Sequence, residues 1–329
     1  MPCSLKVRIE RWPIAGRFII ARGAKTEAVV VVAEVSDGGA TGHGECVPYG
    51  RYGETVESVV EAIESLRGPL AQGLDHTGLQ DLMPAGAARN ALDCALWDFA
   101  AKRAGRPVHA LAGLAAPRPL TTAFTISLGT ADEMATTAGL AAAAGRSMLK
   151  IKLGAAGDQA RLAAVRRAAP AAELIVDANE GWRPTDLEEN FSACVAAGVT
   201  LIEQPLPAGD DALLARVKHP VRICADESVH DRASLPGLVG RYDAVNIKLD
   251  KAGGLTEALA LAAEAERLGF ALMVGSMVAT SLAMAPATLV AQRAAVVDLD
   301  GPLLLAADRP HGLRYEGSLV HPPTPELWG

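Results

Sequence analysis

The feature that most constrains the fold is a series of short apolar runs that each end in Lys, Asp or Glu. From Lys152 to Lys248, these run ends follow one another at intervals of 22 to 26 residues. Such an interval accommodates one strand, a loop, a helix and the return to the next strand. The polar run ends are Lys150 with Lys152, Asp177, Glu203, Asp226, Lys248, and Asp298 with Asp300. The spacing therefore predicts a parallel βα repeat.

Two further apolar runs bring the number of predicted strands to eight. TTAFTISLG opens the repeat at Thr121, and FALMVGSM lies between the runs that end at Lys248 and Asp298. Eight parallel strands with intervening helices close into a barrel, because closure removes the exposed sheet edges. We expect an α/β fold, a (β/α)7β TIM-like barrel over residues 118–305, with its site at the C-terminal mouth.

Residues 1–117 show a different pattern. SLKVRIERWPI alternates apolar and polar residues, as a half-buried strand does, and two more strands are joined at Asp37-Gly38-Gly39. Two helical patterns follow, ETVESVVEAIESL and GAARNALDCALWDFAAKRAG. We predict an α+β capping domain over residues 1–117. The Pro-rich, strand-like segment 306–329 is expected to fold back on this domain.

Composition argues against several classes of protein. The net charge of −7 is unlike that of a nucleic-acid-binding surface. Every apolar stretch is interrupted before the length of about 18 residues that a membrane span needs, and the N-terminus lacks the apolar block of a signal peptide. The five cysteines are odd in number and form no CxxC pair. We expect a reduced, cytoplasmic protein without nucleic-acid or membrane partners; whether it forms a homo-oligomer stays open.

Asp177, Glu203 and Asp226 occupy equivalent positions at the ends of three consecutive predicted strands. Their carboxylates should converge on one side of the barrel mouth, where like charges repel and a divalent cation is the usual resolution. Ligation by oxygen alone favours Mg²⁺ or Mn²⁺ over Zn²⁺. The alternative is that each acid caps a helix or pairs with a lysine, but three such acids in succession favour the metal site.

Lys150 and Lys152 lie two residues apart on one predicted strand, so both side chains face the barrel interior. Two ammonium groups side by side, near a divalent cation, disfavour each other's protonation. The pKa of a lysine there should fall from about 10.4 toward the range of about 7–8 that suits a general base. Lys248 lies across the barrel from Lys152, and its alternative role is that of a counter-ion to Asp177 or Asp226.

This arrangement indicates a reaction class. If the cation binds a substrate carboxylate, loss of the neighbouring α-proton leaves an enediolate that the cation stabilises more than it stabilises the ground state. One lysine removes the proton and the other returns one from the opposite face. The predicted outcome is inversion at carbon, as in a racemase or an epimerase.

The same residues resemble the muconate-lactonizing subgroup of the enolase superfamily, whose bases are Lys or His beside Mg²⁺. The matching motifs are KIK (150–152), DAN (177–179), EQP (203–205), ADES (225–228) and NIK (246–248). Within the subgroup the chain looks most like the L-Ala-D/L-Glu dipeptide epimerases. The stretches that carry this resemblance are IARG (20–23), GECVPYGRYGET (44–55), PAGAARNALDCALWD (84–98), VNIKLDKAGGLTEAL (245–259) and DLDGP (298–302).

The resemblance implies that the three strand-end acids ligate one Mg²⁺ per subunit, with Mn²⁺ as an alternative. It implies that Lys152 and Lys248 are the two acid/base catalysts and that Lys150 assists Lys152. The implied substrate is the dipeptide L-Ala-D/L-Glu, from murein peptides.

Five further residues are implied in substrate binding. Asp298 and Asp300 resemble the DxD pair that holds the dipeptide ammonium group, and two carboxylates at a strand end do make a cation site. Arg22 resembles the arginine of a mobile capping-domain loop that meets the glutamate side chain. Thr125 and Ser276 match polar positions that contact the substrate. The alternatives are a turn pair for the two aspartates and a solvated loop position for Arg22.

Other functions stay open at this point. Other dipeptide epimerases, o-succinylbenzoate synthase, N-succinylamino acid racemase and cycloisomerases share the scaffold, although the DxD pair argues against substrates without a free ammonium group. Lys248 could instead form a Schiff base, as in aldolases, which the acid triad argues against. A non-catalytic barrel is disfavoured because every catalytic position carries the residue type that the chemistry needs. Glu227 is expected to orient Lys150 or the metal ligands, or to be structural.

Overall fold

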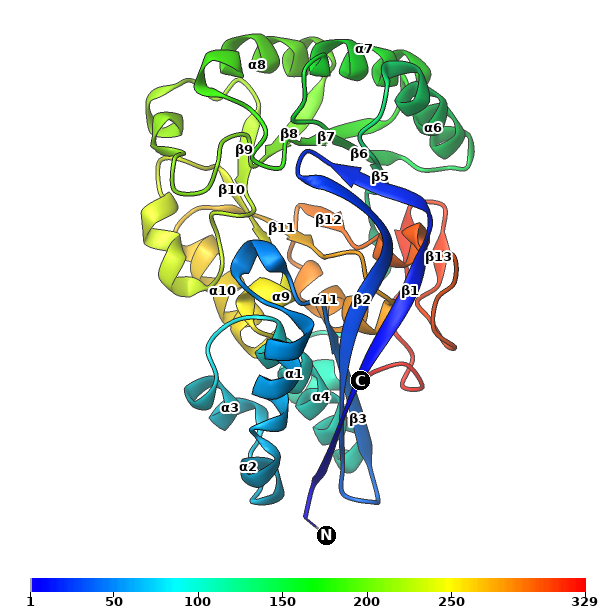
Figure 1. Cartoon of the computed structure of the whole chain (residues 1–329), viewed down its shortest axis with the longest axis vertical. Coiled ribbons are helices and arrows are strands. Elements are labelled where there is room, and N and C mark those ends of the chain that lie inside the picture. The colour runs from blue at the N-terminus through cyan, green and yellow to red at the C-terminus, as the bar shows by residue number, and fades with distance from the viewer. Residues whose placement is uncertain (1) are drawn as a thin grey trace.

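Eight parallel strands form the largest sheet of the computed structural model, which describes residues 2–329 (Figure 1). They are β5 (Phe124–Ile126), β6 (Met148–Lys152), β7 (Glu173–Asp177), β8 (Val199–Glu203), β9 (Arg222–Ala225), β10 (Ala244–Ile247), β11 (Ala271–Gly275) and β12 (Val296–Asp298). They follow one another in chain order across the sheet. The Ala123 amide donates a 2.8 Å hydrogen bond to the Val297 carbonyl and joins the two edges. The sheet is thus nearly closed into a barrel, which confirms the predicted fold class.

Helices cover the outside of the barrel in most crossovers (Figure 1). They are α6 (Ala131–Ala143), α7 (Asp158–Ala168), η2 (Pro184–Asp186), α8 (Leu187–Ala196), α9 (Leu249–Ala252), α10 (Leu255–Arg267) and α11 (Ser281–Ala291). The 3₁₀ helix η5 (Gly301–Leu304) follows the last strand, β12. The crossovers after β8 and β9 differ from the expected βα unit, because they carry only the 3₁₀ helices η3 (Ala212–Arg216) and η4 (Arg232–Leu238). Pro236 lies inside η4, where proline removes a helical hydrogen bond. Within residues 2–329, no helix has both the length and the apolar character needed to cross a bilayer.

The capping domain combines an antiparallel meander with helices. Its elements are β1 (Ser4–Ile20), β2 (Gly23–Ser36), β3 (Thr41–Cys46), η1 (Gly50–Tyr52), α1 (Val56–Glu64), α2 (Arg67–Ala71), α3 (His76–Leu82), α4 (Ala87–Ala104) and α5 (Val108–Leu111). The Asp37 carboxylate accepts hydrogen bonds from the Gly39 and Ala40 amides and fixes the predicted turn between β2 and β3. The β1–β2 hairpin, blue in Figure 1, extends from this domain to the barrel mouth.

Helix α4 docks the capping sheet and the barrel against each other. A Cβ atom at Gly42 or Gly44 of β3 would overlap the α4 backbone, so glycine permits this close approach. On the barrel side, Arg89 donates a 2.7 Å hydrogen bond to the carbonyl of Ala252 in α9. Helix α4 thus packs against both domains.

An apolar layer fills the barrel below the mouth. Its buried members are Ala123, Met148, Ile175, Leu201, Cys224, Ala244 and Met273. Residues two apart on a strand face the same side, so Met148 is followed on the interior face by Lys150, and Ile175 by Asp177. The base of the site is therefore apolar, and the polar residues lie directly above it at the strand ends.

The C-terminal segment contacts both parts of the chain. Its hairpin of β13 (Tyr315–Glu316) and β14 (Leu319–Val320) pairs with β4 (Leu120–Thr121), which precedes the barrel. Arg309 forms 2.6 Å ion pairs with Glu10 and Glu45 of the capping sheet. The Trp328 indole donates a 3.0 Å hydrogen bond to the Cys94 carbonyl of α4.

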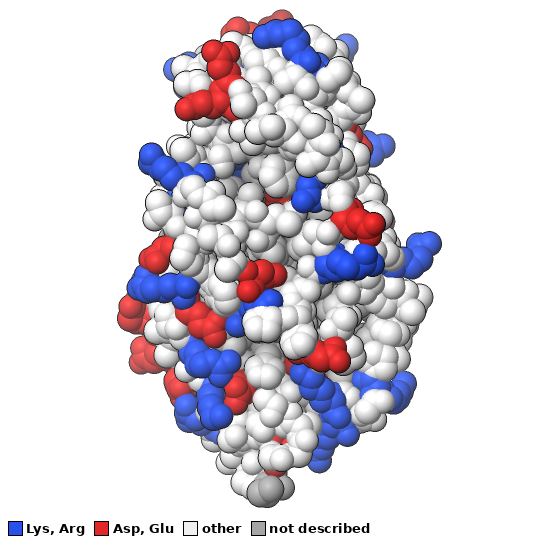
Figure 2. All heavy atoms as spheres, turned by 90° about the vertical axis from the view of Figure 1, so that its right-hand side faces the viewer, with Lys and Arg blue, Asp and Glu red and all other residues white. Residues whose placement is uncertain are grey.

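On the face shown in Figure 2, Lys and Arg side chains are interspersed with Asp and Glu, unlike the basic stripe of a nucleic-acid-binding surface.

Candidate active site

A cavity of about 220 Å³ lies at the C-terminal ends of the barrel strands. The tip of the β1–β2 hairpin covers it, since Phe18, Ile20 and Arg22 line it together with barrel residues. Nine of the eleven residues predicted from the sequence line this cavity. These nine are Arg22, Thr125, Lys150, Lys152, Asp226, Lys248, Ser276, Asp298 and Asp300. The other two, Asp177 and Glu203, are completely buried in the same cluster.

Three carboxylates meet at the base of the site. Asp177 ends β7, Glu203 ends β8, and Asp226 follows β9. Parallel pairing places Asp177 directly beside Glu203. One oxygen of each of the three carboxylates lies within 4.8 Å of the others. All three residues are buried, so water screens their mutual repulsion poorly and nearby positive charge must offset it.

Polar neighbours fix the orientation of each carboxylate. The Asn179 amide donates a 2.8 Å hydrogen bond to Asp177 Oδ1, and Asn246 Nδ2 donates one of 2.7 Å to Glu203 Oε1. The buried Lys251 ammonium group lies 2.5 Å from Asp226 Oδ1. The roles of Asn246 and Lys251 were not predicted from the sequence. Asn246 had a readable signal, because it precedes Lys248 by two residues and therefore faces the same side of β10.

The donor set fits a divalent cation. With the protein charges alone, burial, followed by the charge of Asp177, raises the pKa of Glu203 to about 8. Glu203 Oε2 is buried without a hydrogen bond of good geometry, although Lys150 Nζ lies 2.6 Å away. Carboxylate oxygens alone are the ligands that Mg²⁺ and Mn²⁺ prefer.

The three predicted lysines contact the acids. Lys152 Nζ lies 2.6 Å from Asp177 Oδ2, and Lys248 Nζ lies 2.6 Å from Asp226 Oδ2. Lys150 Nζ lies 2.7 Å from Asp298 Oδ2. The counter-ion role considered for Lys248 is thus present in this structure, without excluding a catalytic one.

The protein charges alone do not lower the pKa of Lys150, contrary to the prediction. Burial lowers the pKa of Lys150, but the carboxylates of Asp298 and Glu203 outweigh it and raise the pKa well above its usual range. Lys248 behaves in the same way, with burial opposed chiefly by Asp226. Positive charge on the acid cluster would oppose both increases.

An acidic pair forms one end of the cavity. Asp298 Oδ1 is buried without a hydrogen-bond partner. Asp300 Oδ2 accepts a 2.6 Å hydrogen bond from the Thr125 amide. Burial, followed by the charge of Asp298, raises the pKa of Asp300 to about 7. Ser276 and Thr125 complete this end of the lining.

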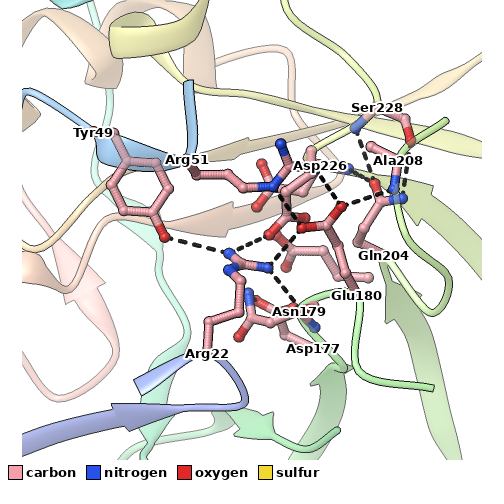
Figure 3. A network of polar contacts seen from close by, with 12 residues as sticks. Arg22, Tyr49, Arg51, Asp177, Asn179, Glu180, Gln204, Ala208, Asp226 and Ser228 are labelled. Atoms are coloured by element: carbon pink, nitrogen blue, oxygen red, sulfur yellow. Dashed lines mark hydrogen bonds and ion pairs between the residues drawn. The ribbon is translucent and has the colours of Figure 1, made fainter. Parts of the chain in front are cut away.

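Arg22 forms another part of the lining and is held by acidic residues (Figure 3). Its Nη2 lies 2.6 Å from Glu227 Oε1, and its Nη1 lies 3.0 Å from Glu180 Oε2. Burial lowers the pKa of Arg22, but the Glu227 carboxylate and the Tyr49 hydroxyl outweigh it and raise the pKa above its usual value. Arg22 therefore does not occupy the solvated loop position that was one alternative. Glu227, for which an orienting role toward Lys150 or the metal ligands and a structural role were both predicted, pairs with Arg22 of the capping domain.

The site combines a buried acid cluster with surrounding lysines at the mouth of a capped barrel. This combination is typical of barrel enzymes that use acid–base catalysis. Comparison with known families identifies the family to which the chain belongs. Residues 3–113 match the mandelate racemase/muconate lactonizing enzyme N-terminal domain, and residues 133–325 match the enolase C-terminal domain-like family. The chain belongs to this family, within the enolase superfamily.

Similar proteins narrow the class of reaction. An L-Ala-D/L-Glu epimerase of Escherichia coli is 48% identical over 97% of this chain and 99% of its own length. An N-acetyl-D-glutamate racemase of Pseudoalteromonas is 44% identical over 91% of this chain and 95% of its own. A crystal structure of an Agrobacterium tumefaciens enolase family member, with homology to dipeptide epimerases and bound to sodium and L-Ala-L-Glu, superimposes with a TM-score of 0.97. It is 57% identical and covers 100% of both chains. The chain is thus an isomerase of the epimerase and racemase type.

Proposed function

We propose that the chain is a Mg²⁺-dependent dipeptide epimerase that inverts the α-carbon of the C-terminal residue in L-Ala-D/L-Glu. One observation carries the proposal, namely that a single cavity is lined by Asp298 and Asp300, by Lys152 and Lys248, and by Arg22. The two aspartates complement the substrate ammonium group, and the two lysines can exchange the proton of the α-carbon. Arg22 complements the side-chain carboxylate. The similarity to the Escherichia coli epimerase supports this assignment, and the proposed substrate would place the reaction in murein peptide metabolism.

The two lysines act as the acid and the base. Lys152 ends β6 and Lys248 follows β10, so they approach the cavity from separate parts of the barrel wall. One Nζ removes the α-proton and the other Nζ delivers a proton to the opposite face, with the roles exchanged in the reverse direction. Lys150 lies beside Asp298 and Glu203 and assists on the Lys152 side.

The metal requirement follows from the acid cluster. Asp177, Glu203 and Asp226 would hold the cation, which when bound supplies positive charge that stabilises a substrate carboxylate as the α-proton leaves. Arg22 orients the glutamate side chain, and the Asp298–Asp300 pair orients the amino end. The capping hairpin over the cavity excludes water, which strengthens each of these charge interactions.

The test is proton NMR of L-Ala-L-Glu in D₂O with the protein and Mg²⁺, beside an EDTA-treated sample. We expect the glutamate α-proton signal to disappear and the L,D diastereomer to accumulate only when metal is present. Exchange without the second diastereomer would show one active lysine and would contradict two-base inversion. An absence of exchange with metal present would refute the proposed substrate.

A second candidate is racemisation of an N-acylated glutamate, which the 44% identical Pseudoalteromonas relative favours. Such a substrate keeps the side-chain carboxylate for Arg22 but has no ammonium group. Asp298 and Asp300 would then face a neutral amide, which leaves two buried carboxylates without a cationic partner from the substrate. The same NMR experiment with N-acetyl-L-glutamate distinguishes the two, and we expect the dipeptide to give the higher kcat/KM.

A further inference from the structure

We propose that Glu180 is a positioning residue that holds Arg22 and a second capping-domain loop on the barrel, and thereby sets the preference for an acidic substrate side chain. The inference rests on the proposed function for its substrate. Glu180 lies in the loop after β7, and the cavity lining includes Arg22 but not Glu180. It must therefore act through Arg22 rather than by touching the substrate.

The Glu180 carboxylate joins three separate segments (Figure 3). Arg51 of η1 donates to both of its oxygens, from Nε at 2.9 Å and from Nη2 at 2.8 Å. Arg22, at the tip of the β1–β2 hairpin, donates from Nη1 at 3.0 Å. The Ala208 amide, in the loop after β8, donates at 2.7 Å. The Glu180 side chain is only 8% exposed, and hydrogen bonds between charged groups are stronger than those between neutral ones.

Arg22 uses both of its terminal nitrogens. Nη1 donates to Glu180 and to the Asn179 carbonyl at 2.7 Å. Nη2 donates to Glu227 at 2.6 Å and to the Tyr49 hydroxyl at 3.3 Å. A substrate carboxylate can bind these nitrogens only by replacing one of these acceptors. Of these four acceptors, Glu227, Tyr49 and Asn179 belong to residues that line the cavity, and Glu180 does not. The substrate can therefore replace one of the other acceptors while Glu180 keeps its contact with Nη1.

The backbone supports a dedicated role for this loop. Asn179 and Glu180 have positive φ angles of 45° and 68°, which non-glycine residues rarely adopt. Hydrogen bonds from the Glu180 amide to the Gln204 carbonyl, at 2.9 Å, and from Trp182 to Pro205, at 3.0 Å, hold the turn. Strained backbone of this kind clusters at functional sites. Here it directs Glu180 to the capping loops immediately after Asp177, which joins the acid cluster.

The substitution Glu180→Gln tests the proposal, because it keeps the side-chain shape and removes the charge. We expect KM for L-Ala-L-Glu to rise about tenfold, the effect of losing a charged hydrogen bond, with kcat unchanged. KM for the neutral isostere L-Ala-L-Gln should stay nearly constant, so the preference for the acidic substrate falls. The matched control is Glu257→Gln, since Glu257 pairs with Arg232 through both oxygens on the barrel outside the cavity, and it should leave both KM values unchanged.

A double-mutant cycle separates positioning from general stability. In an Arg22→Met background, Glu180→Gln should cause no additional loss of selectivity, because the residue through which Glu180 acts is gone. A full additional loss in that background would overturn the proposal. An equal fall in kcat/KM for both dipeptides, accompanied by a lower Tm, would also overturn it, since that is the behaviour of a purely structural residue.

Hydrogen exchange provides a readout that does not depend on the substrate. In the Mg²⁺-loaded protein without dipeptide, Glu180→Gln should accelerate amide exchange in the segments 18–26 and 48–53, whereas Glu257→Gln should not. Unchanged exchange in both segments would refute the anchoring role even if the protein epimerises L-Ala-L-Glu. Faster exchange in a protein that does not turn over this dipeptide would refute the proposed function and the substrate preference while leaving the anchoring intact.

Discussion

The acidic pair at one end of the cavity yields a prediction that separates a dipeptide from an N-acylated substrate. Asp300→Asn removes one negative charge without removing the side-chain oxygen that accepts the 2.6 Å hydrogen bond from the Thr125 amide. Asp298, rather than Asp300, contacts Lys150, so this variant leaves the lysine arrangement intact. The loss should therefore be confined to recognition of the substrate ammonium group.

The magnitude follows from burial and from the contacts of the carboxylate. Asp300 is 4% exposed, and the Thr125 amide bonds to one of its two oxygens. A hydrogen bond between charged groups in such a place contributes about 1.5–3 kcal/mol. We expect kcat/KM for L-Ala-L-Glu to fall about 10- to 100-fold. N-acetyl-L-Ala-L-Glu has no ammonium group and is the matched control substrate. We expect its kcat/KM to change little.

The pH dependence gives a second signature of the same residue. Because the pKa of Asp300 in the free protein is raised to about 7 by burial and by Asp298, the carboxylate ionises as the pH rises through that value. Recognition of an ammonium group needs the ionised form, so kcat/KM for the dipeptide should increase between about pH 6 and about pH 8. Asp300→Asn should remove this increase.

The assay is the rate of α-proton exchange in D₂O, measured by NMR across this pH range for the natural chain and the variant. Equal losses for L-Ala-L-Glu and its N-acetylated form would refute the reasoning, because they would show that Asp300 supports the structure and not the ammonium group. A dipeptide rate that is insensitive to the substitution would place the ammonium group elsewhere in the cavity.

Three further predictions concern the metal, the lysines and the packing of the capping domain. EDTA should abolish α-proton exchange and Mg²⁺ should restore it, because the proposed reaction needs a cation on the oxygen ligands of the acid cluster; exchange that persists in EDTA would contradict this. Lys152→Ala and Lys248→Ala should each stop epimerisation, while one diastereomer still exchanges its α-proton by NMR; full inversion by either variant would contradict a two-base site. Gly44→Ala should lower the free energy of unfolding by about 1–3 kcal/mol, because its Cβ would overlap the Ala91 carbonyl. Thermal melting of the Gly44→Ala variant checks this, with Gly39→Ala as the control because a Cβ atom has room there.

The barrel could be predicted from the sequence because its pattern is local. Each strand alternates interior and exterior residues, and the spacing between strand ends reports the length of a crossover. This spacing alone predicts that Asp177 and Glu203 end neighbouring strands, and their registration follows from parallel pairing. The 3₁₀ crossover after β9 was missed because apolar spacing does not show that Pro236 interrupts helix formation.

The partners of the charged residues could not be predicted in this way. Glu180 meets Arg51 and Arg22 across 129 and 158 residues of sequence, and no periodicity connects a loop after β7 with two loops of another domain. Lys251 was overlooked for a different reason. It lies in the first turn of a short helix, α9, where a lysine is usually solvated, yet here it is buried against Asp226.

The charged groups that are expected to bind the substrate are already paired within the protein. Arg22 is held by Glu227, and Asp298 is held by Lys150. Substrate binding is therefore an exchange of ion pairs, and only the difference between the two sets of contacts contributes to affinity. A ligand without a side-chain carboxylate gains nothing from Arg22, because Glu227 retains it. A ligand that carries both an ammonium group and a side-chain carboxylate replaces two internal contacts at once. Glu180 then keeps Arg22 in place, and Glu203 keeps Lys150 in place. On this view, discrimination arises from internal acids that compete with the substrate, and not from the number of contacts that the cavity offers.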